Sequence, residues 1–208
     1  TRLARAVGQR PLWLAASTHP GEEAIAAEAH ARLKSRYPDI LTIIVPRHPA
    51  RGQEIATDLA RAGRSIARRG AAEALARDTE FYIADTMGEL GLFFRLAPIV
   101  YVGGSLVAHG GQNPLEPAKL GCALIYGPHM FNFRAIVDEF AAAAAAEAVN
   151  DAAGLAHAVD ALIGDRALFL ARAAAASAVA AGKDGIVDGV LAELAPFLGT
   201  QAAGRSDD

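Results

Sequence analysis

The sequence predicts an α/β protein with a parallel sheet that is covered by helices on both faces. Short apolar runs alternate with segments of helical periodicity along most of the chain, which is typical of βαβ units. The apolar runs show no polar alternation, as expected for strands buried on both faces. Polar, glycine-bearing segments follow five of these runs. Because ligands bind at the carboxyl ends of such strands, these five loops predict a single binding cleft.

The individual elements follow from apolar runs, helix periodicity and breaking residues. We expect strands over residues 12–16, 40–45, 65–69, 81–84, 99–102 and 123–126, and a possible edge strand over 146–149. We expect helices over residues 22–37, 51–62, 86–96, 114–120, 133–142, 152–163, 166–181 and 186–198, and a loop or helical turn over 71–77. In the first of these helices, acidic residues at the start and basic residues near the end complement the helix dipole, and Pro38 ends it.

Composition limits the class of protein. The 208 residues suffice for one domain, which we place at residues 1–198, with a disordered tail at 199–208. A net charge of −3 argues against a general nucleic-acid binder. The single cysteine, Cys122, excludes a disulfide framework, and its apolar neighbours predict that it is buried. We find no membrane-spanning run and no signal peptide, and the missing initiator methionine suggests a piece of a longer protein.

The stretch from Gly103 to Pro117 is the densest candidate for a ligand-binding turn. It holds four glycines, a histidine, two amides and Glu116 between a strand and a helix. Asn113 can cap that helix, with proline at the first helical position and Glu116 at the third. Alternatively, the Glu116 carboxylate can accept two hydrogen bonds from a ribose diol. The glycines favour the second interpretation, because a cap needs none of them and they allow the backbone to approach a ligand.

Two earlier loops offer partners for an anion. Ser17, Thr18 and His19 precede a helix whose first amides are free, so they predict either an anion site or a simple cap. Arg47 stands between two prolines after the best strand. A guanidinium there is suited to bind phosphate or carboxylate in bidentate geometry.

The segment from Thr86 to Glu89 also allows two interpretations. Threonine and glutamate three residues apart fit a capping box. That explanation does not account for Gly88. Because a glycine inside a first helical turn lowers helix stability by about 1 kcal/mol, its presence favours a ligand that approaches the backbone.

No P-loop, dinucleotide fingerprint, zinc-protease motif or Ser-His-Asp order is present. We therefore expect neither a metal nor a cofactor. The residues alone support a nucleotide or nucleotide-sugar site on a parallel sheet, and they do not name the reaction.

Several long motifs resemble the Kdo (3-deoxy-D-manno-oct-2-ulosonic acid) transferase family. The matching blocks, which appear in family order, are AASTHPGEE at 15–23, VPRHPAR at 45–51, ADTMGELGLFFRLA at 84–97, VGGSLVAHGGQNPLEPAKLGC at 102–122 and YGPHMFNF at 126–133. The resemblance implies a Rossmann-like domain that forms the C-terminal half of a GT-B glycosyltransferase. One departure is Pro20, where the family pattern has glutamate.

The resemblance also implies a site and a reaction. The donor CMP-Kdo would be bound by Ser17, Thr18, His19, Arg47, Met87, Gly88, Glu89, Gly104, Ser105, Asn113 and Glu116, with Thr18, Arg47 and amides near Gly88 on the phosphate and Glu116 on the ribose. An acceptor hydroxyl of the lipid A precursor would attack the anomeric carbon directly, without a metal.

The acceptor site and the general base would belong to an N-terminal domain that is absent from this sequence. We therefore expect no catalytic residue here, weak binding of CMP and no transfer by this chain alone. Membrane contact would also come through that domain, at the cytoplasmic face of the bacterial inner membrane, while this domain itself would be soluble. The alternatives are another GT-B nucleotide-sugar enzyme, such as an epimerase, or a non-catalytic nucleotide-binding module.

Overall fold

Strand residues alternate between two hydrophobic cores, one on each face of a parallel sheet. In the first strand, Leu14 and Ala16 pack into one core, and Trp13 and Ala15 pack into the other. Trp13 is fully buried. Since both faces of the strand need apolar side chains, its sequence is a continuous apolar run, as expected for a parallel sheet.

The computed structural model describes residues 2–183. All strand pairs are parallel, in the order β3-β4-β2-β1-β5-β6-β7. The strands are β1 (Leu12–Thr18), β2 (Leu41–Pro46), β3 (Ile66–Arg68), β4 (Phe81–Ile83), β5 (Ile99–Val102), β6 (Ala123–Tyr126) and β7 (Ala146–Ala148). From β1 the chain adds β2 on one side, then β3 at the edge and β4 between β3 and β2, and it continues with β5 on the other side of β1. The crevice of the sheet therefore lies between the ends of β1 and β5.

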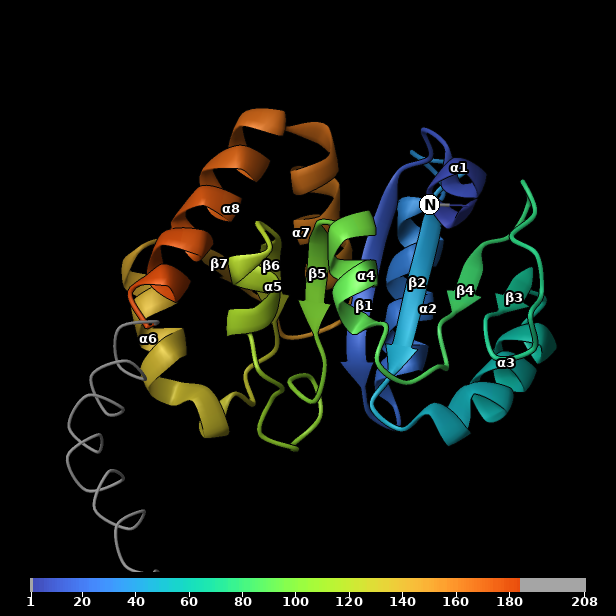
Figure 1. Ribbon diagram of the computed structural model, residues 1–208, viewed down its shortest axis with the longest axis horizontal. Coiled ribbons are helices and arrows are strands. Elements are labelled where there is room, and N and C mark those ends of the chain that lie inside the picture. The colour runs from blue at the N-terminus through green and yellow to red at the C-terminus, as the bar shows by residue number, and fades with distance from the viewer. Residues whose placement is uncertain (1, 184–208) are drawn as a thin grey trace, which may run out of the picture.

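Helices cover both faces, as the sequence predicts (Figure 1). One face carries α2 (Glu22–Leu33), α3 (Gly52–Arg61) and α7 (Ala152–Gly164). The other carries α1 (Arg2–Val7), α4 (Leu90–Leu96), α5 (Leu115–Lys119), α6 (Arg134–Ala142) and α8 (Arg166–Ala181). Two short 3-10 helices, η1 (Pro49–Arg51) and η2 (Phe131–Phe133), lead into α3 and α6.

Most expected elements are present, with three differences. The helix expected over 86–96 begins only at Leu90, because Gly88 has a left-handed φ of 77° that cannot continue a helix. The helix expected over 22–37 ends at Leu33. The helix over 114–120 is shortened to Leu115–Lys119. Residues 71–77 contain turns and no helix. The helix expected over 186–198 and the tail at 199–208 lie outside the described residues.

Cys122 is buried, as its apolar neighbours predict, and burial raises the pKa of its thiol to about 12. Its sulfur lies 3.4 Å from the carbonyl oxygen of Phe94. The cysteine therefore serves as a small core residue that joins β6 to α4. Within residues 2–183, every helix is too short or too polar to cross a bilayer.

The carboxylate of Glu22, at the start of α2, joins the loops at the carboxyl edge of the sheet. Its side chain is completely buried. Oxygen Oε2 accepts from the amides of His19 and Gly104 at 2.9 and 2.7 Å, and Oε1 accepts from the amides of Ser105 and Leu106 at 3.0 Å each. The Tyr101 hydroxyl donates to the same oxygen. Five donors thus compensate one buried charge.

We call the group formed by Glu22 and its donors, His19, Tyr101 and residues 104–106, the Glu22 junction. Close backbone contacts complete it. A Cβ at Gly103 would lie 2.4 Å from the carbonyl oxygen of Ser17, so only glycine allows the loop after β5 to approach β1 so closely. The Ser105 hydroxyl donates to the Val102 carbonyl and accepts from the Gly127 amide at 2.8 Å. The loops after β1, β5 and β6 are therefore fixed to one another.

We expect Glu22→Gln to destabilise the fold by about 2–4 kcal/mol, because a buried amide opposite several N–H donors leaves some of them unsatisfied. Urea unfolding gives the free energy. Glu28→Gln is the matched control on the same helix: Glu28 is 57% exposed and pairs with Arg32, so its loss should cost less than about 0.5 kcal/mol. Equal losses in the two variants would contradict the role of the junction.

Candidate functional site

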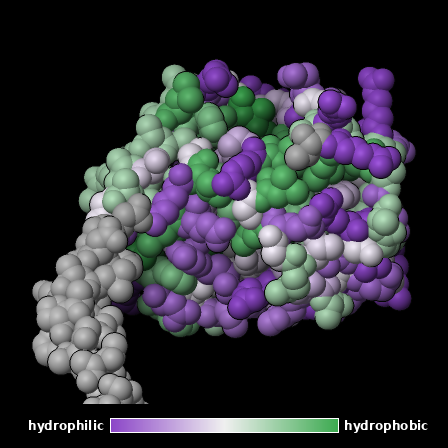
Figure 2. All heavy atoms as spheres, viewed as in Figure 1, coloured by the Kyte–Doolittle hydropathy of each residue, from purple (hydrophilic) through white to green (hydrophobic). Residues whose placement is uncertain are grey.

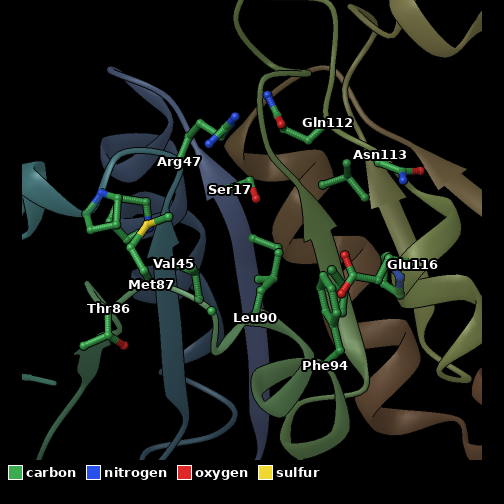
Figure 3. A pocket seen from close by; sticks show the side chains of 17 residues that line it. Ser17, Val45, Arg47, Thr86, Met87, Leu90, Phe94, Gln112, Asn113 and Glu116 are labelled. Atoms are coloured by element: carbon green, nitrogen blue, oxygen red, sulfur yellow. The ribbon is translucent and has the colours of Figure 1, made fainter. Parts of the chain in front are cut away.

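A cavity of about 280 Å³ opens at the carboxyl edge of the sheet, where the loops after β1, β2, β4 and β5 meet. Its floor is apolar and is formed by Val45, Leu90, Phe94, Val100 and Val102. Polar side chains surround this floor (Figure 3). They are Ser17, Arg47, Thr86, Gln112, Asn113 and Glu116. An apolar floor with a few converging polar groups is the usual form of a small-molecule site.

Ser17 reaches the cavity because of an irregularity in β1. Thr18 pairs with Pro46 directly after Ala16 pairs with Val45, so Ser17 is the extra residue of a bulge. Its φ is 55°, in the left-handed region. A bulge redirects a side chain out of the strand ladder, and it turns Ser17 to the cavity.

Thr18 does not line the cavity. Its buried hydroxyl donates to Oε1 of Glu23 at 2.7 Å, and Glu23 also pairs with Arg51, whose Nη1 lies 2.7 Å from the same oxygen. The expectation that the Thr18 hydroxyl holds phosphate therefore disagrees with the structure. The hydroxyl instead links β1 through Glu23 to the loop that carries Arg47.

Arg47 lies at the mouth of the cavity and is exposed. Its amide donates to the carbonyl of Thr18 at 3.0 Å, which fixes its backbone. Its guanidinium makes no hydrogen bond or ion pair with residues 2–183, whereas the nearby Arg51 and Arg69 are paired with acids. Arg47 is thus available to an anion in the cavity.

Glu116 and Asn113 come from the start of α5. Asn113 accepts from the Leu115 amide at 3.0 Å in a turn just before α5, and it also lines the cavity. The N-cap position is Pro114, which makes no side-chain cap, so the expected cap at Asn113 is not formed. The exposed Glu116 carboxylate accepts no hydrogen bond from residues 2–183 and lies beside Gly91, where a Cβ would be 3.9 Å from its Oε1. Both oxygens are available to a ligand.

The loop before α4 is held by an ion pair. Arg69 forms a bidentate pair with Glu89, and the Thr86 hydroxyl donates to the same carboxylate. These contacts lower the pKa of Glu89 to about 2, Arg69 contributing most and Thr86 next. Thr86 and Glu89 therefore do not form a capping box, because the helix begins after them. Met87 and Gly88, which stand between Thr86 and Glu89 in the sequence, both line the cavity, and Met87 is 79% exposed. Glu89 does not line the cavity.

Three other expected binding residues belong to the Glu22 junction. Gly104 and Ser105 give their amides to Glu22, and neither lines the cavity. His19 is 5% exposed and stacks on His109 with ring centroids 3.6 Å apart. It is connected to the site by Gln112, whose Nε2 lies 3.0 Å from Nε2 of His19.

Sequence reasoning missed Gln112 as a lining residue and treated Thr86 only as a helix cap. For Gln112 a signal was available, since it stands between two glycines and Asn113 in the densest loop. The apolar floor carried no such signal, because in the sequence an apolar residue that lines a cavity cannot be distinguished from one that is packed in the core. Within residues 2–183, no three His, Cys, Asp or Glu side chains are arranged to hold a metal ion.

We expect Arg69→Met to destabilise the chain by about 1–2 kcal/mol at pH 7, because Glu89 loses its main partner and is 30% exposed. The folded pKa of Glu89, about 2, is below its ordinary value of 4.5. The stabilisation should therefore be complete above pH 4.5 and disappear as the pH falls towards 2. Urea unfolding of wild type and variant at pH 7 and pH 3 measures the difference, which should shrink at pH 3.

Arg61→Met is the control for this measurement. Arg61 is 77% exposed and pairs with Asp58 only three residues away, so we expect a change below about 0.5 kcal/mol at either pH. A difference between wild type and Arg69→Met that is the same at both pH values would contradict the ion-pair explanation.

The chain is similar to curated 3-deoxy-D-manno-octulosonic acid transferases. It is 40% identical over 158 residues to the enzyme of Haemophilus influenzae, covering 76% of this chain and 37% of that protein. It is 36% identical over 195 residues to the enzyme of Bordetella pertussis, covering 91% of this chain and 45% of that protein. The chain thus spans less than half the length of these relatives. No family model matches it.

Among solved structures, the chain resembles the C-terminal CMP-Kdo binding domain of WaaA from Acinetobacter baumannii. The TM-score is 0.79 at 33% identity, over 86% of this chain and 96% of that domain. WaaG, a glycosyltransferase involved in lipopolysaccharide biosynthesis, matches at a TM-score of 0.54 and 14% identity, over 86% of this chain and 45% of that protein, which shows the shared fold. The expected fold, the C-terminal half of a GT-B glycosyltransferase, is confirmed. With a third of its residues identical over almost the whole of the WaaA domain, the chain belongs to the 3-deoxy-D-manno-octulosonic acid transferase family.

Proposed function

We propose that this chain is the donor-binding domain of a Kdo transferase and that its cavity holds CMP-Kdo. One observation carries the proposal: Arg47 and Glu116 face the same cavity, which has an apolar floor. Neither charged group is paired with another side chain within residues 2–183. The similar domain from Acinetobacter baumannii is a CMP-Kdo binding domain, which agrees with this chemistry.

The two charged groups suit different parts of the nucleotide. Arg47 can bind the phosphate through two parallel N–H donors. Glu116 can accept hydrogen bonds from both hydroxyls of the ribose, because both of its oxygens are available. The amide of Gly88, which also lines the cavity, adds a further donor for the phosphate.

These contacts can also support transfer. In the proposed reaction, an acceptor hydroxyl attacks the anomeric carbon of Kdo, and the bond from that carbon to the phosphate oxygen breaks, so that CMP leaves with the bonding electrons. Negative charge therefore develops on the phosphate. A guanidinium bound to the phosphate stabilises this charge in the transition state.

The remainder of the transferase would supply the acceptor site and the base. We propose that the acceptor is the lipid A precursor and that contact with the cytoplasmic face of the bacterial inner membrane is made by the N-terminal domain. The length of the relatives, of which the chain covers less than half, supports a second domain in the whole transferase.

We expect Arg47→Ala to weaken CMP binding by about 1.5–3 kcal/mol, the range for a hydrogen bond to a charged group. Isothermal titration calorimetry at fixed ionic strength measures the affinity, with Arg61→Ala as the control and UDP as the comparison ligand. Unchanged affinity in Arg47→Ala would refute the phosphate contact. Equal affinity for UDP and CMP would favour another nucleotide-sugar enzyme.

We expect Glu116→Gln to reduce the preference for a ribonucleotide, because an amide has only one acceptor oxygen for the two ribose hydroxyls. Wild type should bind CMP more tightly than 2′-deoxy-CMP, by roughly three- to tenfold for one lost hydrogen bond. Glu116→Gln should bind the two ligands with nearly equal affinity. The same preference in both proteins would show that Glu116 does not contact the ribose.

A further inference from the structure

Gln112 lies on the rim of the cavity, on the same side as Arg47. Figure 3 shows it with Arg47 on the outer side, beyond the strand ends, while Glu116 lies beside Phe94. If Glu116 takes the ribose and Arg47 the phosphate, the group attached to the phosphate extends past Gln112. This placement rests on the proposed function.

The Gln112 side chain is held by His19. The amide nitrogen lies 3.0 Å from Nε2 of the imidazole. His19 itself has little freedom: its amide donates to Glu22, its ring stacks on His109, and a Cβ at Gly104 would lie only 3.2 Å from its Cδ2. The Glu22 junction thus fixes His19, and His19 fixes the glutamine.

This contact determines which end of the amide meets a ligand. Burial, and next the neighbouring His109, lower the pKa of His19, so the ring is neutral near pH 7. A neutral imidazole can accept the Gln112 N–H at Nε2. The amide oxygen then remains for the cavity, and Figure 3 shows this oxygen on the side of Ser17. Such an oxygen accepts from a hydroxyl and is unsuited to a phosphate.

We propose that Gln112 recognises the sugar of the nucleotide sugar, with Oε1 accepting a hydrogen bond from a sugar hydroxyl, and that His19 is the positioning residue that orients this amide. CMP has no hydroxyl beyond its phosphate, so the contact is made only when the sugar is attached. Gln112 therefore distinguishes a sugar-bearing nucleotide from the free nucleotide.

The test compares two ligands, CMP and CMP-Kdo, on the 208-residue chain. The quantity measured by calorimetry is the ratio of the CMP dissociation constant to that of CMP-Kdo. Gln112→Met keeps the length of the side chain and removes its hydrogen bonds, so the ratio should fall about three- to tenfold. Gln9→Met, a substitution of an exposed glutamine outside the cavity, should leave the ratio unchanged.

His19 is tested by a double-mutant cycle. His19→Leu should lower the ratio as Gln112→Met does, and the double variant should lower it no further, because both changes remove one contact. His19→Gln, which keeps a polar group near the Nε2 position, should restore part of the ratio. Thermal unfolding confirms that each variant is folded at the temperature of titration.

The outcomes separate this inference from the proposed function. Wild type that fails to bind CMP refutes both. Wild type that binds CMP, with an unchanged ratio in Gln112→Met, overturns only the sugar contact. Additive losses in the double variant overturn the positioning role of His19, because a merely structural histidine would act independently of Gln112.

Discussion

The buried carboxylate of Glu22 is the interaction on which the carboxyl edge of the sheet depends. A charge without solvent is costly unless hydrogen bonds compensate it. Here the compensation comes from backbone amides on two separate loops and from the Tyr101 hydroxyl. Each loop can satisfy its share only when the other is in place, so the contact fixes their relative position. The same two loops border the cavity, so this contact also fixes the position of its walls.

The charged residues around the cavity divide into two groups. Arg51 and Arg69 are paired with Glu23 and Glu89, and these pairs anchor the loops that carry Arg47 and Gly88. Arg47 has no partner within residues 2–183. Structural ion pairs therefore hold the walls while one cation remains available to a ligand. A cation at this place can stabilise negative charge that develops on a bound ligand.

The sheet supplies the remaining constraint. Its strands place five loops on one edge, and the strand order reverses between the neighbouring strands β1 and β5, where the crevice that binds ligands in such sheets opens. Two hydrophobic cores, one on each face, hold the strands and helices in register. The bulge at Ser17 shows how a local departure from the ladder serves the site, since it directs a hydroxyl into the cavity.

The class of fold, the family resemblance and most of the loops that meet at the cavity can be predicted from the sequence, because apolar periodicity, breaking residues and motifs are local signals. Arg47, Gly88, Asn113 and Glu116 could be selected in this way, and all line the cavity. The packing of the folded chain was needed to show that Thr18, Glu89 and Ser105 contact other protein groups and that Gln112 lines the cavity. The physical reason is that a polar side chain in a loop carries the same local signal whether its partner is a ligand or a residue eighty positions away. Which partner it meets depends on how distant loops pack.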